Sequence, residues 1–498
     1  MRQGAKHSMG WLASSIGMAK YTHDLIVIGA GSGGLGAAGF GGAIGLKVAL
    51  IDRTQHDYGG DCLNYGCVPS KALLHVAAQF AGAREASRFG MKTEGKADLA
   101  GVMDYIHRRQ DVIRAHETPS YLEKEYGIEC IVGEAMLTGR REVSVNGRKL
   151  TARRIVLATG SRPRHLKVTG VEAVKQYDNE SLFSQLRELP DHLLIVGGGP
   201  NSCEMAQAFC RLGSQVTLLN RGGRLLSKDP APAAAALEKK LREEGVDVRH
   251  QTEVKRFTDA HTAELTQEGN AAGTLAFSHL LVAIGREVRT QGLGLELAGV
   301  YTKEGKIVVD DYYRTTNEAI YTVGDAYGHE MFSHAAEMHN TDLWTNMLSP
   351  VDKRHRLDHF SWVTFTDPEV ATFGLTPEQL DKRGIAYETV HQSFADDDRA
   401  VAADYRDSVL LLYLQKTPLG SGKLLGGCMV APAAGEMIQE LLLLNILGKK
   451  YSALTNKLYA YPVGSRINQK PARDRAQRRL LSPLTKRLLQ AAYRLQNR

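Results

Sequence analysis

Two copies of one short pattern constrain the fold of this chain most: a buried strand runs into a glycine-rich turn and then into a run of small residues. The first copy is DLIVIGAGSGGLGAA, residues 24–38, and the second is LLIVGGGPNSCEMAQAF, residues 193–209. This layout is typical of the strand–turn–helix unit that binds a dinucleotide. Two copies predict an α/β chain with two nucleotide-binding domains.

In the first copy, each glycine of the turn has an expected role. Gly29 allows the tight turn, Gly31 lets a pyrophosphate approach the backbone, and Gly34 allows close helix packing. The next strand, KVALID, ends at Asp52, where a carboxylate can accept hydrogen bonds from ribose hydroxyls. A glycine-rich surface loop is the alternative, but the acid at this spacing disfavours it.

The second copy differs at the ribose end. Its turn carries Gly197 and Gly199, and its second strand ends at Asn220, with no carboxylate nearby. Arg221 and Arg224 follow and can pair with a 2′-phosphate, which favours NADPH over NADH. The alternative is that both arginines lie on a solvated turn.

Three further strands end in glycine turns: IVLATGS at 155–161, LLVAIGRE at 280–287 and AIYTVGDA at 319–326. In this order along the chain they are typical of a protein that returns to its nucleotides several times. We therefore predict cofactor contacts at Thr159, Gly160, Gly285, Gly324 and Asp325.

Cys62 and Cys67 lie five residues apart in GGDCLNYGCVPSK, residues 59–71. Zinc is a poor interpretation because no second Cys or His pair stands at ligand spacing. A purely structural disulfide is also a poor interpretation, because closing so short a loop removes little entropy from the unfolded chain. A strained local disulfide of the labile, catalytic kind remains, with two inert thiols as the alternative.

With these motifs together, the chain resembles the flavoprotein disulfide reductases, the family of glutathione reductase, dihydrolipoamide dehydrogenase and mercuric reductase. The resemblance runs from about Tyr21 to about Asn468 and is greatest to the mercuric reductase-like and dihydrolipoamide dehydrogenase-like branch. Its most specific element is GGDCLNYGCVPSK, in which Asp61 stands where the family usually has threonine. The resemblance implies a homodimer that uses FAD and NADPH (or NADH).

The resemblance also implies a domain order, with two Rossmann-like domains followed by a C-terminal α+β dimerisation domain. The expected parts are an N-terminal arm (1–20), a discontinuous FAD domain (21–162 and 291–357), an NAD(P)H domain (163–290), a dimerisation domain (358–468) and a basic tail (469–498).

Residue roles follow from the same resemblance. Cys67 would lie against the flavin as the charge-transfer thiolate, while Cys62 would attack the substrate. Lys71 would lie near the flavin N5, paired with Glu204 of the second glycine motif, and Gly60 would contact FAD.

The segment LYAYPVGSRINQK, residues 458–470, departs from the family pattern. Tyr461 stands where disulfide reductases have a catalytic histidine, and Arg466 where they have its glutamate. A phenol, with an ordinary pKa of about 10, is a poor proton donor and acceptor at neutral pH. No cysteine follows Cys428, which excludes mercury transfer through a C-terminal cysteine pair.

A His-rich stretch follows the turn at Asp325, with His334 and His339 near Glu330. We expect Glu330 and His334 to share a helical face, and these residues to line the mouth of the active site. We expect no metal site.

Charge and cysteine content favour a cytoplasmic enzyme that works at or near a membrane. Six cysteines in 498 residues make no disulfide scaffold, and the net charge is +7. Much of that charge lies in RRLLSPLTKRLLQAAYRLQNR, residues 478–498, where a helix should restart near Ser482. Its leucines and basic residues suit an anionic membrane surface or an acidic partner; docking on its own dimer is the alternative. Nucleic acid is not expected.

The sequence thus predicts an FAD-dependent NAD(P)H oxidoreductase that passes electrons to a Cys62–Cys67 disulfide. The acceptor would be a metal ion, a disulfide, a quinone or a partner protein. One alternative is a diaphorase or quinone reductase that bypasses the cysteines. Another is a flavin-loaded redox sensor or partner-binding subunit with little turnover.

Overall fold

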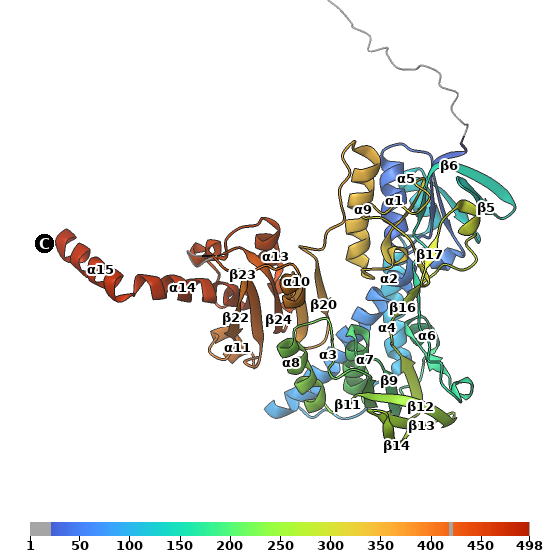
Figure 1. The fold of residues 1–498 in the computed structure, drawn as a ribbon. Coiled ribbons are helices and arrows are strands. Elements are labelled where there is room, and N and C mark those ends of the chain that lie inside the picture. Colours follow the sequence, from blue (N-terminus) through green and yellow to red (C-terminus); the bar gives the residue numbers. More distant parts are fainter. Residues whose placement is uncertain (1–20, 418–421, 498) are drawn as a thin grey trace, which may run out of the picture. The chain divides into compact units, whose positions relative to one another are not determined.

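A computed structural model describes residues 21–417 and 422–497, and these form two compact units (Figure 1). The first unit contains the chain up to Tyr58 together with Glu117–Gly160 and Thr290–Pro350. The second contains Gly59–His116, Ser161–Arg289 and the chain from Val351 onward. The arm expected over residues 1–20 lies outside the described residues.

The first unit is built on a parallel sheet in the order β3-β2-β1-β6, with β19 also paired to β6 and an antiparallel extension through β5 and β4. Its strands are β1 (His23–Ile28), β2 (Val48–Asp52), β3 (Glu129–Val132), β4 (Met136–Gly139), β5 (Glu142–Val145), β6 (Arg148–Leu157), β17 (Thr302–Lys303), β18 (Lys306–Ile307) and β19 (Ile320–Thr322). Its helices are α1 (Ser32–Ala43), η1 (Gln55–Asp57), α5 (Pro119–Tyr126), η4 (Glu296–Ala298), η5 (Gly324–Tyr327) and α9 (Ser333–Leu348).

Small residues let helix α1 pack closely on α9. A Cβ at Gly36 would lie 2.2 Å from the side-chain nitrogen of Asn340, and one at Gly41 would lie 3.2 Å from Trp344. The run of glycine and alanine in the sequence is therefore required by packing on both sides of the helix.

The second unit contains a parallel sheet in the order β11-β10-β9-β15-β8. Its strands, with those of two smaller sheets, are β7 (Ser161–Pro163), β8 (Gln176–Tyr177), β9 (His192–Val196), β10 (Gln215–Asn220), β11 (Asp247–His250), β12 (Thr252–Asp259), β13 (Thr262–Gln267), β14 (Asn270–Ala276), β15 (His279–Val282) and β16 (Arg286–Val288). Its helices are η3 (Val171–Ala173), α6 (Asn179–Gln185), α7 (Pro200–Leu212) and α8 (Ala231–Glu243).

The cysteine motif opens a helical layer of the same unit. This layer consists of α2 (Gly60–Asn64), α3 (Cys67–Glu85), η2 (Ala86–Phe89) and α4 (Leu99–Arg114). Helix α3 packs on α4 and α7, with Leu73, Ala77 and Phe209 buried in one hydrophobic core. The core thereby fixes the cysteine helix against the helix that follows the second glycine turn.

The C-terminal part of the second unit is an antiparallel sheet in the order β20-β21-β24-β23-β22. Its strands are β20 (Ser361–Thr364), β21 (Glu369–Gly374), β22 (Tyr387–Ser393), β23 (Val409–Gln415) and β24 (Leu424–Ala431). Its helices are α10 (Pro377–Lys382), α11 (Asp398–Ala402), α12 (Ala434–Met437), α13 (Gln439–Ile446), η6 (Tyr451–Asn456), η7 (Gly464–Gln469), α14 (Lys470–Leu480) and α15 (Pro483–Gln496).

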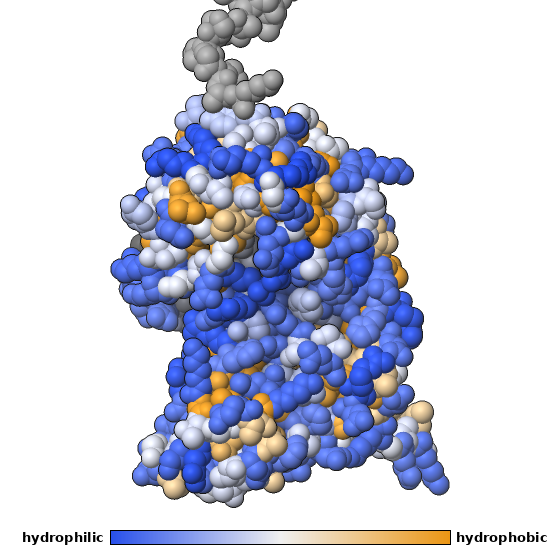
Figure 2. All heavy atoms as spheres, turned by 90° about the vertical axis from the view of Figure 1, so that its right-hand side faces the viewer, coloured by the Kyte–Doolittle hydropathy of each residue, from blue (hydrophilic) through white to orange (hydrophobic). Residues whose placement is uncertain are grey.

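The predicted fold class is confirmed: two parallel α/β sheets are followed by an antiparallel α+β section. Within the described ranges, no helix is long and apolar enough to cross a membrane. On the face drawn in Figure 2, hydrophobic residues form separate patches among hydrophilic ones.

Candidate active site

The two motif cysteines lie on successive helices. Cys62 is half-buried within α2, and Cys67 is the exposed first residue of α3. The turn between them closes on the carbonyl oxygen of Asp61, which accepts the backbone N–H groups of Tyr65 at 2.8 Å and Gly66 at 2.6 Å. Because Cys67 begins a helix of nineteen residues, the positive end of the helix dipole favours a thiolate at this position.

The side chain of Gln110 of α4 forms hydrogen bonds to the loop between the two cysteines, a contact that the sequence did not predict. Its buried side-chain nitrogen donates to the carbonyl oxygens of Leu63 at 2.8 Å and Asn64 at 2.9 Å. The last carbonyls of a short helix need such partners when they are buried. At the other end of α2, Gly60 has φ = 61°, in the left-handed region.

Lys71 and Glu204 form the ion pair expected from the sequence. The Lys71 Nζ lies 2.8 Å from Glu204 Oε2, and the Glu204 side chain is 3 % exposed against 37 % for Lys71. Glu204 Oε1 accepts the backbone N–H of Phe365 at 2.8 Å, and the ammonium lies 4.4 Å from the centre of the Phe365 ring. The carboxylate is therefore fully partnered, and it fixes the cation on α3 one turn beyond Cys67.

Asp61, the departure from the family motif, is held by an arginine. Its Oδ1 atom accepts from Arg286 at 3.0 Å and from the Asn179 side chain at 2.9 Å. Arg286 also donates to the hydroxyl of Ser161 at 2.6 Å. This network joins the start of the cysteine loop to α6, β7 and β16.

The second glycine turn leaves room for a ligand. Gly197 has φ = 142°, and a Cβ there would lie 2.4 Å from the carbonyl oxygen of Ala283, so only glycine fits. At Gly199, which caps α7, a Cβ would meet nothing within 4 Å. Ser202 is fully buried where a third glycine is typical, and Gly285 follows β15 with φ = 108°.

Asn220 organises the loop that follows β10. Its side-chain nitrogen donates to the carbonyl oxygens of Gly222 at 3.0 Å and Arg224 at 2.9 Å, and its oxygen accepts the N–H of Gly222 at 3.1 Å. The Arg221 side chain is 85 % exposed, and Arg224 donates to the carbonyl oxygen of Ser227. Arg221 Nε also lies 3.9 Å from Glu253 Oε1, so the turn presents two cations, with one carboxylate of β12 beside Arg221.

The carboxylate predicted beside the first glycine turn, Asp52, contacts that turn in the structure. Asp52 at the end of β2 accepts the backbone N–H of Ala30 at 2.6 Å, and burial raises the pKa of its carboxyl group while that hydrogen bond opposes the rise. A Cβ at Gly34 would lie 1.7 Å from the carbonyl oxygen of Gly29. Gly31 begins α1 with no side-chain cap, so the first N–H groups of the helix face the turn.

Four other residues predicted to contact a cofactor lie at strand ends of the first unit. Thr159 and Gly160 follow β6, and Gly324 and Asp325 begin η5, one residue after β19. A Cβ at Gly33 would lie 3.2 Å from the backbone nitrogen of Gly324, so this turn adjoins the start of α1.

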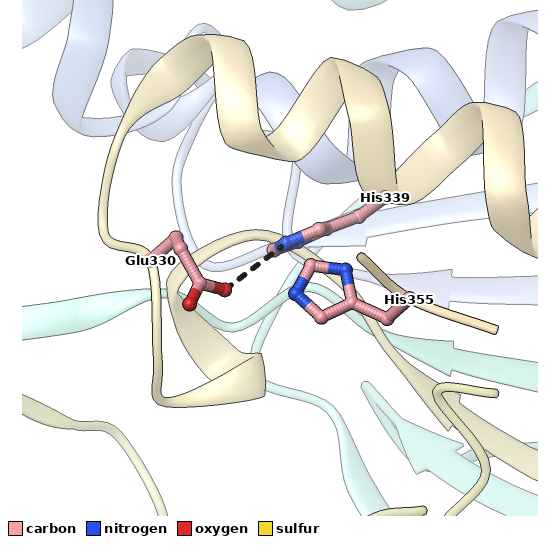
Figure 3. Close-up of side chains that lie close together, drawn as sticks. All are labelled: Glu330, His339 and His355. Carbon is pink, nitrogen blue, oxygen red and sulfur yellow. Dashed lines mark ion pairs between the residues drawn. The ribbon is translucent and has the colours of Figure 1, made fainter. Parts of the chain in front are cut away.

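The His-rich stretch differs from expectation. Helix α9 begins at Ser333, so Glu330 precedes it and does not share a helical face with His334. His339 is fully buried and accepts the backbone N–H of Gly324 at 3.2 Å, with Glu330 3.9 Å from its other ring nitrogen (Figure 3). The prediction that His339 lines the mouth of the active site is therefore wrong, because the buried His339 ring accepts a hydrogen bond from the Gly324 turn.

Tyr461 lies at the surface, with 68 % of the residue exposed. Its hydroxyl donates to Asp398 of α11 at 3.2 Å, and the Arg466 guanidinium lies 5.4 Å from the centre of its ring. Arg466 also lies 3.8 Å from Asp398. A phenol, a guanidinium and a carboxylate therefore form one cluster at this surface.

Both turns fit a dinucleotide. Helices α1 and α7 start at glycines without side-chain caps, which is the geometry that receives a pyrophosphate. Asp52 suits the ribose of an unphosphorylated adenosine, whereas the second turn offers cations at the same place.

Comparison with known proteins agrees with this geometry. Residues 23–341 match the family described as "Pyridine nucleotide-disulphide oxidoreductase", and residues 360–470 match its dimerisation domain. This chain belongs to the pyridine nucleotide-disulphide oxidoreductase family. It is a flavoprotein oxidoreductase of a family that uses FAD, NAD(P)H and a redox disulfide, and its dimerisation domain implies a homodimer.

Individual members of the family resemble the chain over most of its length. It is 38 % identical to a mercuric reductase of Streptomyces lividans over 84 % of this chain and 88 % of the relative. It is 33 % identical to a dihydrolipoyl dehydrogenase of Thermus scotoductus, over 89 % and 95 %. Among solved structures, the Cu(II) complex of the HOCl-induced flavoprotein disulfide reductase RclA from Escherichia coli gives a TM-score of 0.79 at 26 % identity, covering 91 % and 99 %.

Proposed function

We propose that this family member oxidises NADPH and passes the electron pair through a Cys62–Cys67 disulfide to an acceptor that needs no proton at a leaving thiolate. A metal ion or a quinone meets that requirement. The observation that carries the proposal is the Lys71–Glu204 pair at 2.8 Å, which places a cation one helical turn from Cys67.

The chain's own residues would serve a route from nucleotide to cysteines. FAD, held at the first glycine turn, would supply two-electron transfer from NADPH to the Cys62–Cys67 disulfide, and opening that S–S bond would leave a thiolate at Cys67 and a thiol at Cys62 that carries the proton of the hydride. Lys71, held by Glu204, supplies positive charge where negative charge develops, and the start of α3 stabilises the Cys67 thiolate. Re-forming the S–S bond would then release two electrons to the acceptor and the one proton of the Cys62 thiol.

The same assignment covers the rest of the chain. We place FAD on 21–162 and 291–357, NADPH on 163–290 and the dimer contact on 358–468. Gly29, Gly31, Asp52 and Asp325 would hold FAD, and Arg221 and Arg224 would hold the 2′-phosphate. A reducing cytoplasm would supply NADPH and keep the other cysteines as thiols.

Acceptor choice follows from Tyr461 and Arg466. A disulfide substrate leaves as a thiolate that a nearby acid must protonate, and a phenol does this poorly at neutral pH. Metal ions and quinones avoid that step. The names of the relatives bear on the acceptor in both directions: mercuric reductases and a Cu(II) complex favour a metal ion, whereas dihydrolipoyl dehydrogenases favour a disulfide.

Thiol counting tests the central route. The chain has six cysteines, so closure of one pair leaves four thiols in the oxidised protein. We expect four thiols after air oxidation and six after anaerobic incubation with NADPH, measured in denaturant. A count that NADPH does not change would contradict the proposal and would favour a diaphorase that bypasses the cysteines.

A further inference from the structure

The last helix, α15, is strongly amphipathic, and none of its side chains is buried. Leu484, Leu488 and Leu495 are 71 %, 63 % and 66 % exposed. With Ala491 they follow the spacing i, i+4, i+7, i+11, which places them on one face of a helix. Removing such a continuous apolar stripe from water is favourable, so we expect another apolar surface to cover it.

Cations border the leucine stripe of α15. Helical periodicity places Arg487 and Arg494 along one edge of the stripe and Lys486 opposite it, and the last turn of α14 adds Arg478 and Arg479. No acidic residue occurs after Asp474 in the sequence. An occupant of this surface must therefore offer an apolar layer bordered by negative charge.

The position of α15 separates it from the family's dimer contact. The match to the dimerisation domain ends at residue 470, the first residue of α14. In Figure 1, α15 extends away from the antiparallel sheet of its unit, beyond α14. The dimer typical of the family therefore does not by itself account for the leucine face.

We propose that α15 docks this enzyme on the surface of a membrane that contains anionic lipid. The leucine stripe would lie at the boundary of headgroups and acyl chains, with the cations at the phosphates. Fourteen residues are too few to span a bilayer and suit a helix that lies in its plane. A second copy offers the same cationic helix, so pairing of copies concentrates positive charge, whereas anionic lipid neutralises it.

Vesicle sedimentation with the full-length dimer tests this proposal, which does not depend on the proposed electron route. We expect binding to vesicles of phosphatidylcholine with one third phosphatidylglycerol, little binding to phosphatidylcholine alone, and a steep loss of binding as salt rises. Leu484→Glu with Leu488→Glu should weaken binding about tenfold or more, as should Lys486→Glu with Arg487→Glu. NADPH oxidation by these variants should stay at the wild-type rate.

A matched control places the same two substitutions elsewhere. Leu297 and Leu348 are 57 % and 61 % exposed outside α15, so Leu297→Glu with Leu348→Glu should leave vesicle binding unchanged. Equal binding by the α15 variants and wild type would overturn the proposal. A second result would also overturn it: wild-type protein does not bind anionic vesicles and elutes larger than a dimer, whereas the Leu484→Glu, Leu488→Glu protein elutes as a dimer. A second copy of the chain would then cover the leucine face.

Discussion

At the donor end of this site, Lys71 of α3 and Glu204 of α7 make a partly buried ion pair at 2.8 Å beside the cysteine motif. At the acceptor end, Tyr461 is exposed, bonded to Asp398 and adjacent to Arg466. In the proposed route, the first arrangement supports reduction of the disulfide by a flavin. The second offers a phenol in place of the imidazole that would protonate a thiolate leaving an external disulfide. On this proposal the two half-reactions can be modified separately.

The largest loss of activity should come from replacing the two cysteines that carry the electron pair in the proposed route. Cys62→Ser with Cys67→Ser should lower NADPH-dependent Cu(II) reduction by about 10³-fold or more, because no other pair can carry the electrons. Quinone reduction should fall as well, because in the proposed route a quinone takes its electrons from the same cysteine pair. Cys210→Ser, a half-buried cysteine that donates to the Glu244 carbonyl, is the control. If the double variant reduced Cu(II) and the quinone as fast as the wild type, the flavin would reduce both acceptors without the cysteines.

Breaking the donor-end pair should have the next largest effect. Glu204→Gln keeps an acceptor for the Phe365 N–H but removes the negative partner of Lys71, and we expect a loss of about 10²-fold in turnover. The free energy of unfolding should fall by about 1–3 kcal/mol, since Lys71 is partly solvated. Glu243→Gln, at an exposed pair 3.7 Å from Lys239, should alter neither quantity. Wild-type turnover in Glu204→Gln would mean that the pair is only structural.

Coenzyme choice is the third test of the donor end. Arg221→Ala with Arg224→Ala should reduce the preference for NADPH over NADH by about 10–100-fold, because charge-assisted contacts are worth about 1.5–3 kcal/mol. Asn220→Asp is not an equivalent test, since the amide nitrogen donates to two carbonyl oxygens that a carboxylate would repel. A wild type that prefers NADH would show that the arginines are only surface charges.

Restoring the acceptor end should have a smaller, opposite effect. Tyr461→His with Arg466→Glu returns the residue types found in disulfide reductases, and we expect turnover with lipoamide to rise about tenfold. Tyr461→Phe, which removes only the hydroxyl bonded to Asp398, should leave Cu(II) reduction unchanged. A fall in lipoamide turnover in the double variant would indicate that Tyr461 already serves as the acid.

The smallest effect should come from Asp61. Asp61→Thr restores the usual family residue but removes the hydrogen bond that Arg286 donates to the Asp61 carboxylate, so we expect a loss of about 1 kcal/mol in the free energy of unfolding. Urea denaturation measures it. A stabilised Asp61→Thr protein would show that the network with Arg286 and Asn179 costs more than it contributes.

Short-range patterns explain what could be predicted from the sequence. The two glycine turns, the acid at Asp52, the cysteine motif and the restart of the helix at Pro483 are each contained within about thirty residues. The Lys71–Glu204 pair spans 133 positions and was expected only through resemblance to the family. The contacts of Gln110 with Leu63 and of Asp61 with Arg286 have no local signature, because they depend on how separate elements pack. His339 was misjudged for the same reason: polar composition does not reveal burial.

The acceptor profile of the wild-type enzyme tests the contrast between the two ends most directly. Steady-state kinetics at pH 7 with NADPH would compare Cu(II) and a quinone with lipoamide and glutathione disulfide. We predict that kcat/KM for the first two exceeds that for the disulfides by about 10²-fold or more, because only the disulfides need a proton at the leaving group. Efficient reduction of lipoamide or glutathione disulfide, with kcat/KM of about 10⁶ M⁻¹s⁻¹, would contradict the account and show that another residue supplies that proton.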